Sequence, residues 1–264
     1  MGVIVRRASA RQRQFLTNAR KNPAFIACMW SANIPNLTMI RSLIALIAFS
    51  LLPLAATAHS LWIEELPDNA GLGVRFAQWG DEYEVSPGNL DAFVQVSGWT
   101  LDDKGLPQLF EVAKKKDHFF LVKVDGTRPA FAQAQFTVRK LHEDKPARAP
   151  VFYCRWQPEG AGAGTPAMTM DVVPTGMPGE ARVYFRGKPL GGVELLFFSP
   201  KVSDLKLQAD AEGYVHAPDI SKPGQYLLAV ARYSEELPGF FNGVPFGITS
   251  HSASLYWTVK EAKK

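Results

Sequence analysis

Two histidines and one acid stand out as residues that could hold a metal ion: His59, His251 and Glu65. His59 follows Ala56-Thr57-Ala58, a small-residue pattern of the kind that signal peptidases cleave. Cleavage after Ala58 would leave His59 with a free α-amino group, and that amine can chelate one cation together with imidazole Nδ1 of the same residue. Imidazole and amine nitrogens suit Cu(II), Ni(II), Co(II) or Zn(II) and not calcium or magnesium.

His251 is the candidate third nitrogen ligand. It begins one face of the expected last strand, which alternates as His251, Ala253, Leu255, Trp257 and Val259. With His59 it would complete a three-nitrogen histidine brace, as in copper chaperones and copper monooxygenases. The other interpretation is an ordinary histidine at a strand edge. Alternation also puts Glu65 with His59 and Glu64 with Trp62, so either carboxylate could orient a metal ligand or lie exposed to solvent.

These residues follow a segment with the layout of a secretory signal peptide, residues 39–58. It has a start-type Met39, one cation at Arg41 and an apolar run from Leu43 to Leu54. That run of about a dozen residues is shorter than the roughly 20 that a permanent membrane helix needs. We therefore expect a cleaved leader and a periplasmic or secreted protein. Residues 1–38, which hold six basic residues and no acid, are interpreted as a misassigned extension.

The net charge changes sign when the leader is removed. Seven of the 29 Lys and Arg lie in residues 1–58 and none of the 25 Asp and Glu, so the mature chain has 22 basic and 25 acidic residues. Its formal charge is therefore −3. The excess of basic residues in the whole chain comes from the leader, so it does not indicate a nucleic-acid or acidic-membrane partner.

Enzyme signatures are absent from the sequence. It contains no Gly-x-Ser-x-Gly, no phosphate loop and no glycine-rich dinucleotide turn. Cys154 is the one cysteine after the leader, and its strand-like flanks predict a buried, inert thiol. His118 and His142 are expected at the surface and His216 in a structural role. Core packing rather than sugar stacking is expected of the tryptophans, which are Trp79, Trp99, Trp156 and Trp257.

The segments that must position the candidate ligands are all predicted to be strands. Short alternating apolar runs are separated by Gly, Pro, Asn and Asp, and no stretch has a convincing period of 3.6 residues. The chain is therefore predicted to be all-β, with two β-sandwich-like regions. The first spans residues 59–158 and includes strands near 72–79, 92–97, 118–124 and 132–138.

A Gly/Ala-rich stretch at 159–166 suggests a boundary before the second region, residues 167–264. Seven strands are expected there, at intervals of roughly ten residues. That spacing is typical of an immunoglobulin-like sandwich. The segment from Glu235 to Thr249 is long and apolar, and we expect it to be a loop that serves as a lid or an interface.

Two parts of the sequence resemble the periplasmic components of nickel/cobalt uptake systems. One is the C-terminal series Gly187-Lys-Pro-Leu, Asp210-Ala-Glu-Gly and Pro223-Gly-Gln-Tyr-Leu with the last apolar strand. The other is Ala58-His-Ser-Leu-Trp62 with an acid behind it, across the expected cleavage site. The resemblance covers most of residues 56–264. It implies a secreted protein with an immunoglobulin-like or carboxypeptidase-regulatory-like C-terminal module and a role in nickel or cobalt uptake.

Three functional hypotheses follow. The first is a non-enzymatic periplasmic binding protein for Ni(II) or Co(II), with an inner- or outer-membrane metal transporter as its partner. The second is a copper-binding protein or oxidative enzyme built on the brace of His59 and His251. The third is a metal-free extracellular binding or adhesion sandwich. None of the three requires a nucleic-acid partner or a membrane span after cleavage.

Overall fold

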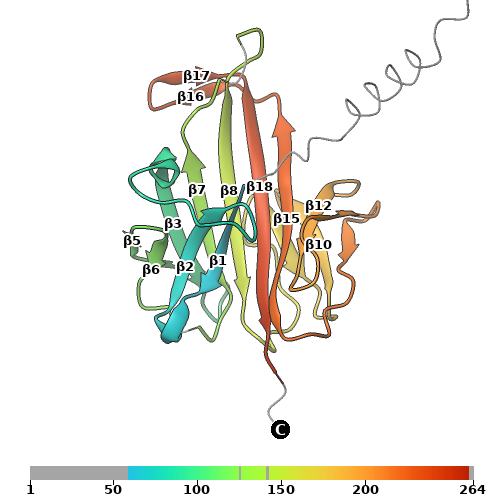
Figure 1. Cartoon of the computed structure of the whole chain (residues 1–264). Coiled ribbons are helices and arrows are strands. Elements are labelled where there is room, and N and C mark those ends of the chain that lie inside the picture. The colour runs from blue at the N-terminus through green and yellow to red at the C-terminus, as the bar shows by residue number, and fades with distance from the viewer. Residues whose placement is uncertain (1–58, 125, 141–142, 262–264) are drawn as a thin grey trace, which may run out of the picture. The chain divides into compact units, whose positions relative to one another are not determined.

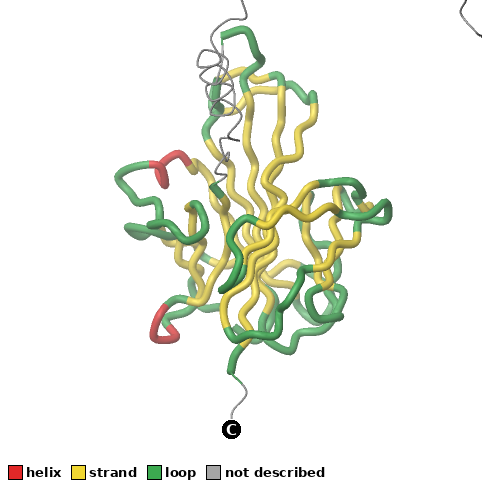
Figure 2. The backbone as a smooth tube through the Cα atoms, turned by 45° about the vertical axis from the view of Figure 1, so that its right-hand side comes forward, coloured by secondary structure: helices red, strands yellow, loops and turns green. Residues whose placement is uncertain are grey.

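A computed structural model of the protein describes residues 59–124, 126–140 and 143–261. The predicted extension (1–38), the predicted signal peptide (39–58) and His142 lie outside these described residues. The described part is all strands and loops apart from two short 3-10 turns, η1 (Pro67–Asn69) and η2 (Asn89–Ala92). The predicted all-β class is confirmed, and the strands are plain in Figure 2.

An eight-stranded sheet forms the centre of the fold (Figure 1). Its order is β13 (Leu205–Gln208), β12 (Glu194–Phe198), β15 (Gly224–Glu235), β18 (Ile248–Val259), β8 (Arg148–Gln157), β7 (Ala130–Phe136), β3 (Phe93–Leu101) and β4 (Pro107–Phe110). Neighbours pair antiparallel except β18 and β8, which run parallel from Ile248 opposite Arg148 to Trp257 opposite Gln157. Because β8 precedes the Gly/Ala stretch and β18 follows it, strands of both expected regions share one sheet.

A smaller sheet covers each face of this central sheet. On one face lies the order β1 (Ser60–Glu65), β2 (Leu72–Ala77), β6 (Phe119–Leu121) and β5 (Val112–Lys114). On the other face β10 (Glu180–Phe185) pairs with β9 (Met170–Pro174), β11 (Lys188–Pro189) and β14 (Tyr214–His216). The sheet of β9, β10, β11 and β14 and the central sheet that it faces form the immunoglobulin-like sandwich of the C-terminal region.

The central sheet is buried on both faces, which explains its apolar strands. Along β15, Leu227 and Ala229 join the core beneath β1 and β2, whereas Leu228 and Val230 join the core beneath β9 and β10. Strand alternation therefore sends successive residues into different cores. We call these the β1-side core and the β9-side core.

The Gly/Ala stretch at 159–166 has no strand, as predicted, but hydrogen bonds fix its position. Arg155 Nη2 donates to the carbonyl of Thr165 over 2.7 Å, and the same guanidinium pairs with Asp171 at 2.6 Å. The amide of Gly164 donates to Pro174. Next to Arg155, Cys154 is fully buried, and burial raises the pKa of its thiol well above the usual range. The prediction of a buried cysteine is confirmed.

The segment before β18 is not the irregular loop expected from sequence. It forms a two-stranded hairpin, β16 (Gly239–Phe241) and β17 (Val244–Phe246), at the top of Figure 1. The Asn242-Gly243 pair between the strands adopts the positive φ angles that a tight hairpin turn requires. No helix in the described part of the chain is long and apolar enough to cross a membrane.

Candidate functional site

His59 lies at the surface immediately before β1 and is held by the chain that follows β2. Its Nε2 lies 2.8 Å from Oε1 of Glu84, and its ring packs 5.2 Å from the ring of Phe76. Glu84 is itself anchored, because its amide donates to the carbonyl of Phe76 over 2.9 Å. The His59 side chain is 43% exposed, so the ring is both oriented by protein groups and open to solvent.

The contact with Glu84 selects one tautomer of the His59 ring. Because a carboxylate oxygen only accepts hydrogen bonds, the neutral tautomer that fits this contact carries its proton on Nε2 and keeps the lone pair of Nδ1. Nδ1 is the nitrogen that can close a chelate ring with the α-amino group of the same residue. A carboxylate behind a metal-binding histidine is a common way to fix its orientation and raise its basicity. Glu84, rather than Glu64 or Glu65, is therefore the carboxylate that contacts His59.

Glu65 does not approach His59. It is the exposed last residue of β1, and six residues of extended chain separate the two by about 20 Å. The expectation that the two residues share a face would not by itself bring them into contact. Glu65 thus lies outside the surroundings of His59 in this structure.

The structure does not bring His251 to His59. His251 is 4% exposed on β18 and points into the β9-side core. Tyr153 Oη lies 3.1 Å from its Nδ1, and Glu235 Oε2 lies 3.1 Å from its Nε2. His59 instead contacts Phe76 of the β1-side core. The two histidines face opposite sides of the central sheet, and both His251 nitrogens are engaged, so this arrangement does not form a three-nitrogen brace.

The surroundings of His251 are those of a buried structural histidine. Burial lowers the pKa of His251, although its hydrogen bond to Glu235 acts in the opposite direction. Its ring stacks on Tyr153 and meets the edge of Phe185. Glu235 also receives two hydrogen bonds from Arg186. Within residues 59–124, 126–140 and 143–261, no group of three or more His, Cys, Asp or Glu side chains is placed to hold a metal ion.

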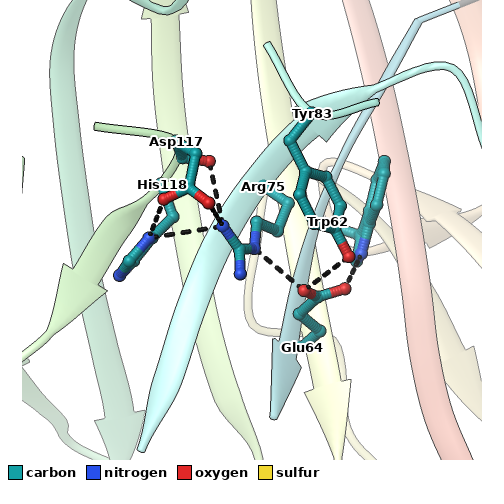
Figure 3. A network of polar contacts seen from close by, with 6 residues as sticks. All are labelled: Trp62, Glu64, Arg75, Tyr83, Asp117 and His118. Carbon is teal, nitrogen blue, oxygen red and sulfur yellow. Dashed lines mark hydrogen bonds and ion pairs between the residues drawn. The ribbon is translucent and has the colours of Figure 1, made fainter. Parts of the chain in front are cut away.

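A buried polar network lies on β1 and β2 and includes Tyr83 from the loop after β2 (Figure 3). Its centre is Glu64, which is 4% exposed. Glu64 accepts from Trp62 Nε1 at 2.9 Å, from Arg75 Nε at 2.9 Å and from Tyr83 Oη at 3.0 Å. Solvent exposure, the alternative considered for Glu64, is therefore wrong. The expected shared face of Trp62 and Glu64 is confirmed.

Arg75 carries the network on to a second acid. Its Nη1 lies 2.6 Å from a carboxylate oxygen of Asp117 and also donates to the main-chain oxygen of that residue. Asp117 in turn contacts Nδ1 of His118 at 2.8 Å. Only 15% of the His118 side chain is exposed, so the expectation of a surface histidine is wrong. Two carboxylates thus share one guanidinium.

The charges of this network shift its acid–base equilibria. Burial and the adjacent Glu64 carboxylate raise the pKa of Tyr83 to about 12. Burial acts to raise the pKa of Asp117, but hydrogen bonds from His118 and Arg75 hold that pKa below its usual range. Burial acts to lower the pKa of Arg75, and its bonds to Glu64 and Asp117 raise it overall. At neutral pH Arg75 and Asp117 are therefore ionised and Tyr83 is a neutral hydrogen-bond donor.

Sequence reasoning missed Arg75, Tyr83, Glu84 and Asp117. Arg75 had a detectable signal, because an antiparallel hairpin of β1 and β2 places it opposite Trp62, next to Glu64 along the same face. The other three come from loops or strand ends far from β1 in sequence. No local pattern relates them to His59 or Glu64.

Comparison with known proteins leaves the family open. No protein-family model matches the chain, and no curated protein sequence matches it. A chimeric titin Z1Z2-Z1Z2 tandem carrying a GRGDS peptide from fibronectin is similar over 71% of this chain and 90% of its own, at 12% identity and a TM-score of 0.17. A TM-score this low carries no argument, and the β-sandwich assignment stands on the strands and cores described above.

Proposed function

We propose that the mature protein begins at His59 and is a periplasmic protein that binds one Ni(II) or Co(II) ion for uptake by a membrane transporter. The metal is cargo in this proposal, not a permanent cofactor. The observation that carries it is the pairing of His59 with Glu84 at an exposed position. This pairing leaves Nδ1 available beside the α-amino group that cleavage after Ala58 would create.

The donor chemistry supports a transition metal over a hard cation. An amine and an imidazole nitrogen in a six-membered chelate ring suit Ni(II), Co(II) and Cu(II), whereas calcium and magnesium require oxygen ligands. Two protein nitrogens leave several coordination positions for water or for ligands of a receiving protein. Such an open site favours transfer of the ion over permanent storage. The resemblance of the motifs quoted above, which covers most of residues 56–264, to nickel/cobalt uptake components points the same way.

The decisive experiment compares two forms of the protein that differ by one residue. One form begins at His59 and the other retains Ala58 ahead of it. Calorimetric titration with NiCl2 or CoCl2 is expected to give about one ion per chain for the first form. Binding by the second form should be at least about tenfold weaker, because an amide nitrogen replaces the amine. Equal affinity of the two forms would contradict the chelate.

Two controls complete this experiment. Edman sequencing of the exported protein checks that the chain begins at His59. A His216→Ala variant tests whether binding comes from histidines in general, because His216 is also exposed and pairs with Glu180. We expect its affinity to equal that of the parent form. Loss of binding in His216→Ala would place the metal elsewhere.

A further inference from the structure

An open hollow of roughly 490 Å³ lies beside the Glu64 network. It is bounded by the end of β1, by the loop after β2, by residues that follow β12 and by the start of β15. Its lining includes Trp62, Glu64, Trp79, Asp81, Glu82 and Tyr83. The hollow is separate from the contacts of His59, which lie around Glu84 and Phe76.

Three aromatic rings form the apolar part of this hollow. The Trp62 ring lies 5.4 Å from that of Trp79 and 6.2 Å from that of Tyr83, with an angle of 54° between planes in both pairs. Inclined rings make a concave corner rather than a flat stack. The electron-rich face of an aromatic ring attracts a cation, most strongly when water is partly excluded. Trp62 is only 2% exposed and Arg75 already lies over one face of the Tyr83 ring, so Trp79 and the other face of Tyr83 provide the ring surface that is open to a ligand.

The charge of the hollow is negative. Glu64 and Asp117 share the single charge of Arg75, which gives these three groups a net charge of −1. The exposed acids Asp81 and Glu82 add two more negative charges at the rim. No lysine or arginine belongs to the lining of the hollow. The described surroundings therefore favour a positively charged occupant.

The rings are fixed before any ligand binds. Trp62 Nε1 and Tyr83 Oη both donate to Glu64, as Figure 3 shows, and the Arg75 guanidinium lies 4.1 Å from the centre of the Tyr83 ring. Trp79 packs against Phe198 and Tyr256 of the central sheet. A preformed site loses little conformational entropy on binding.

We propose that this hollow binds a small organic cation of the quaternary or alkylated ammonium class. An inorganic divalent ion fits less well, because the Glu64 oxygens already accept three hydrogen bonds from protein groups. A flat sugar ring prefers a coplanar aromatic platform, which the 54° inclination does not provide. An ammonium group with methyl substituents matches the concave rings by shape and the acids by charge.

The test uses a pair of probes that share a shape and differ in charge. Choline and its neutral analogue 3,3-dimethylbutan-1-ol are titrated into the mature protein, and tryptophan fluorescence and calorimetry report binding. We expect saturable choline binding and at least tenfold weaker binding of the alcohol. Equal binding of the two probes, or no saturable binding of choline, would overturn the proposal.

Variants locate the site and separate it from the metal chelate. Trp79→Ala should weaken choline binding at least tenfold and Trp79→Phe much less, since a ring remains. Glu82→Gln should weaken it a few-fold at low salt, and this variant tests the charge even if Trp79→Ala fails to fold. Trp99, which stacks on Phe131 away from the hollow, provides the matched control Trp99→Ala. Unchanged choline affinity in both Trp79→Ala and Glu82→Gln would overturn the proposal, whatever the result for Ni(II) at His59.

Discussion

The Ser254 hydroxyl of β18 donates a hydrogen bond to the main-chain oxygen of Leu61 in β1 over 2.7 Å. The two residues are 193 positions apart, and both are buried. This bond joins the strand that follows His59 to the central sheet. The position of the candidate metal ligand therefore depends on the last strand of the chain.

Ser254→Ala should destabilise the protein by about 1–3 kcal/mol, because the buried Leu61 carbonyl loses its partner. Urea unfolding monitored by tryptophan fluorescence measures this change. Ser234→Ala is the matched control, since Ser234 is exposed on β15. Its free energy of unfolding should change by less than about 0.5 kcal/mol. Similar values for the two variants would show that the bond contributes nothing specific.

Glu84→Ala should weaken Ni(II) binding by the mature protein about 10- to 100-fold, as does the loss of other carboxylates that orient a metal-binding histidine. The measurement is calorimetric titration of the form that begins at His59. Glu82→Ala serves as its control, because Glu82 is an exposed carboxylate two residues away, whereas His59 contacts Glu84. An unaltered affinity in Glu84→Ala would separate the carboxylate from the metal site.

Asp171→Ala should be among the most damaging substitutions, at about 3–5 kcal/mol, because it leaves the buried guanidinium of Arg155 without its carboxylate partner. Both side chains are at most 1% exposed. The exposed pair of Lys206 and Glu194 offers a comparison, and Glu194→Ala should cost less than about 1 kcal/mol. Thermal unfolding of the two variants side by side tests the contrast, and equal costs would contradict it.

The stability of the protein should fall on acidification, and His251 should contribute to that fall. Burial lowers the pKa of His251 in the folded state, so the unfolded chain binds the proton more readily. The histidine is neutral in both states well above pH 6.5 and makes no difference there. Below that pH the unfolded state gains protons first, and stability declines by at most about 1.4 kcal/mol per pH unit from this group.

The His251→Gln variant tests this assignment. Gln does not titrate, so the variant should lose less stability than the parent between about pH 6.5 and 5. His216→Gln is the control, since His216 is an exposed histidine of β14. Its pH profile of unfolding should follow that of the parent. A parent-like profile for His251→Gln would show that other groups cause the acid sensitivity.

Much of the fold could be predicted because strand formation is encoded locally. All seven strands expected after residue 166 are present, including β10 at Glu180–Phe185 and β15 at Gly224–Glu235. The hairpin β16–β17 was missed because its strands are three residues long and its apolar side chains do not alternate. The parallel pairing of β18 with β8 was also beyond sequence reasoning, because nothing local links strands about 100 residues apart.

The candidate site was predictable only where neighbours in sequence make the contact. The shared face of Trp62 and Glu64 followed from alternation, whereas Glu84 reaches His59 from a loop 25 residues away. His118 looked like a surface residue beside its lysines, yet Asp117 and Arg75 enclose it. Such contacts depend on how β2 and β6 pair.

The sequence by itself determined the strand periodicity, the chelating chemistry that His59 would have if cleavage occurred after Ala58, and the negative formal charge of residues 59–264. Only the tertiary structure decided which candidates meet. Alternation tells which residues of β18 share a face with His251, but not which smaller sheet covers that face. Long-range pairing placed β9 and β10 over His251 and β1 over the opposite face, so His59 is paired with Glu84 and separated from His251.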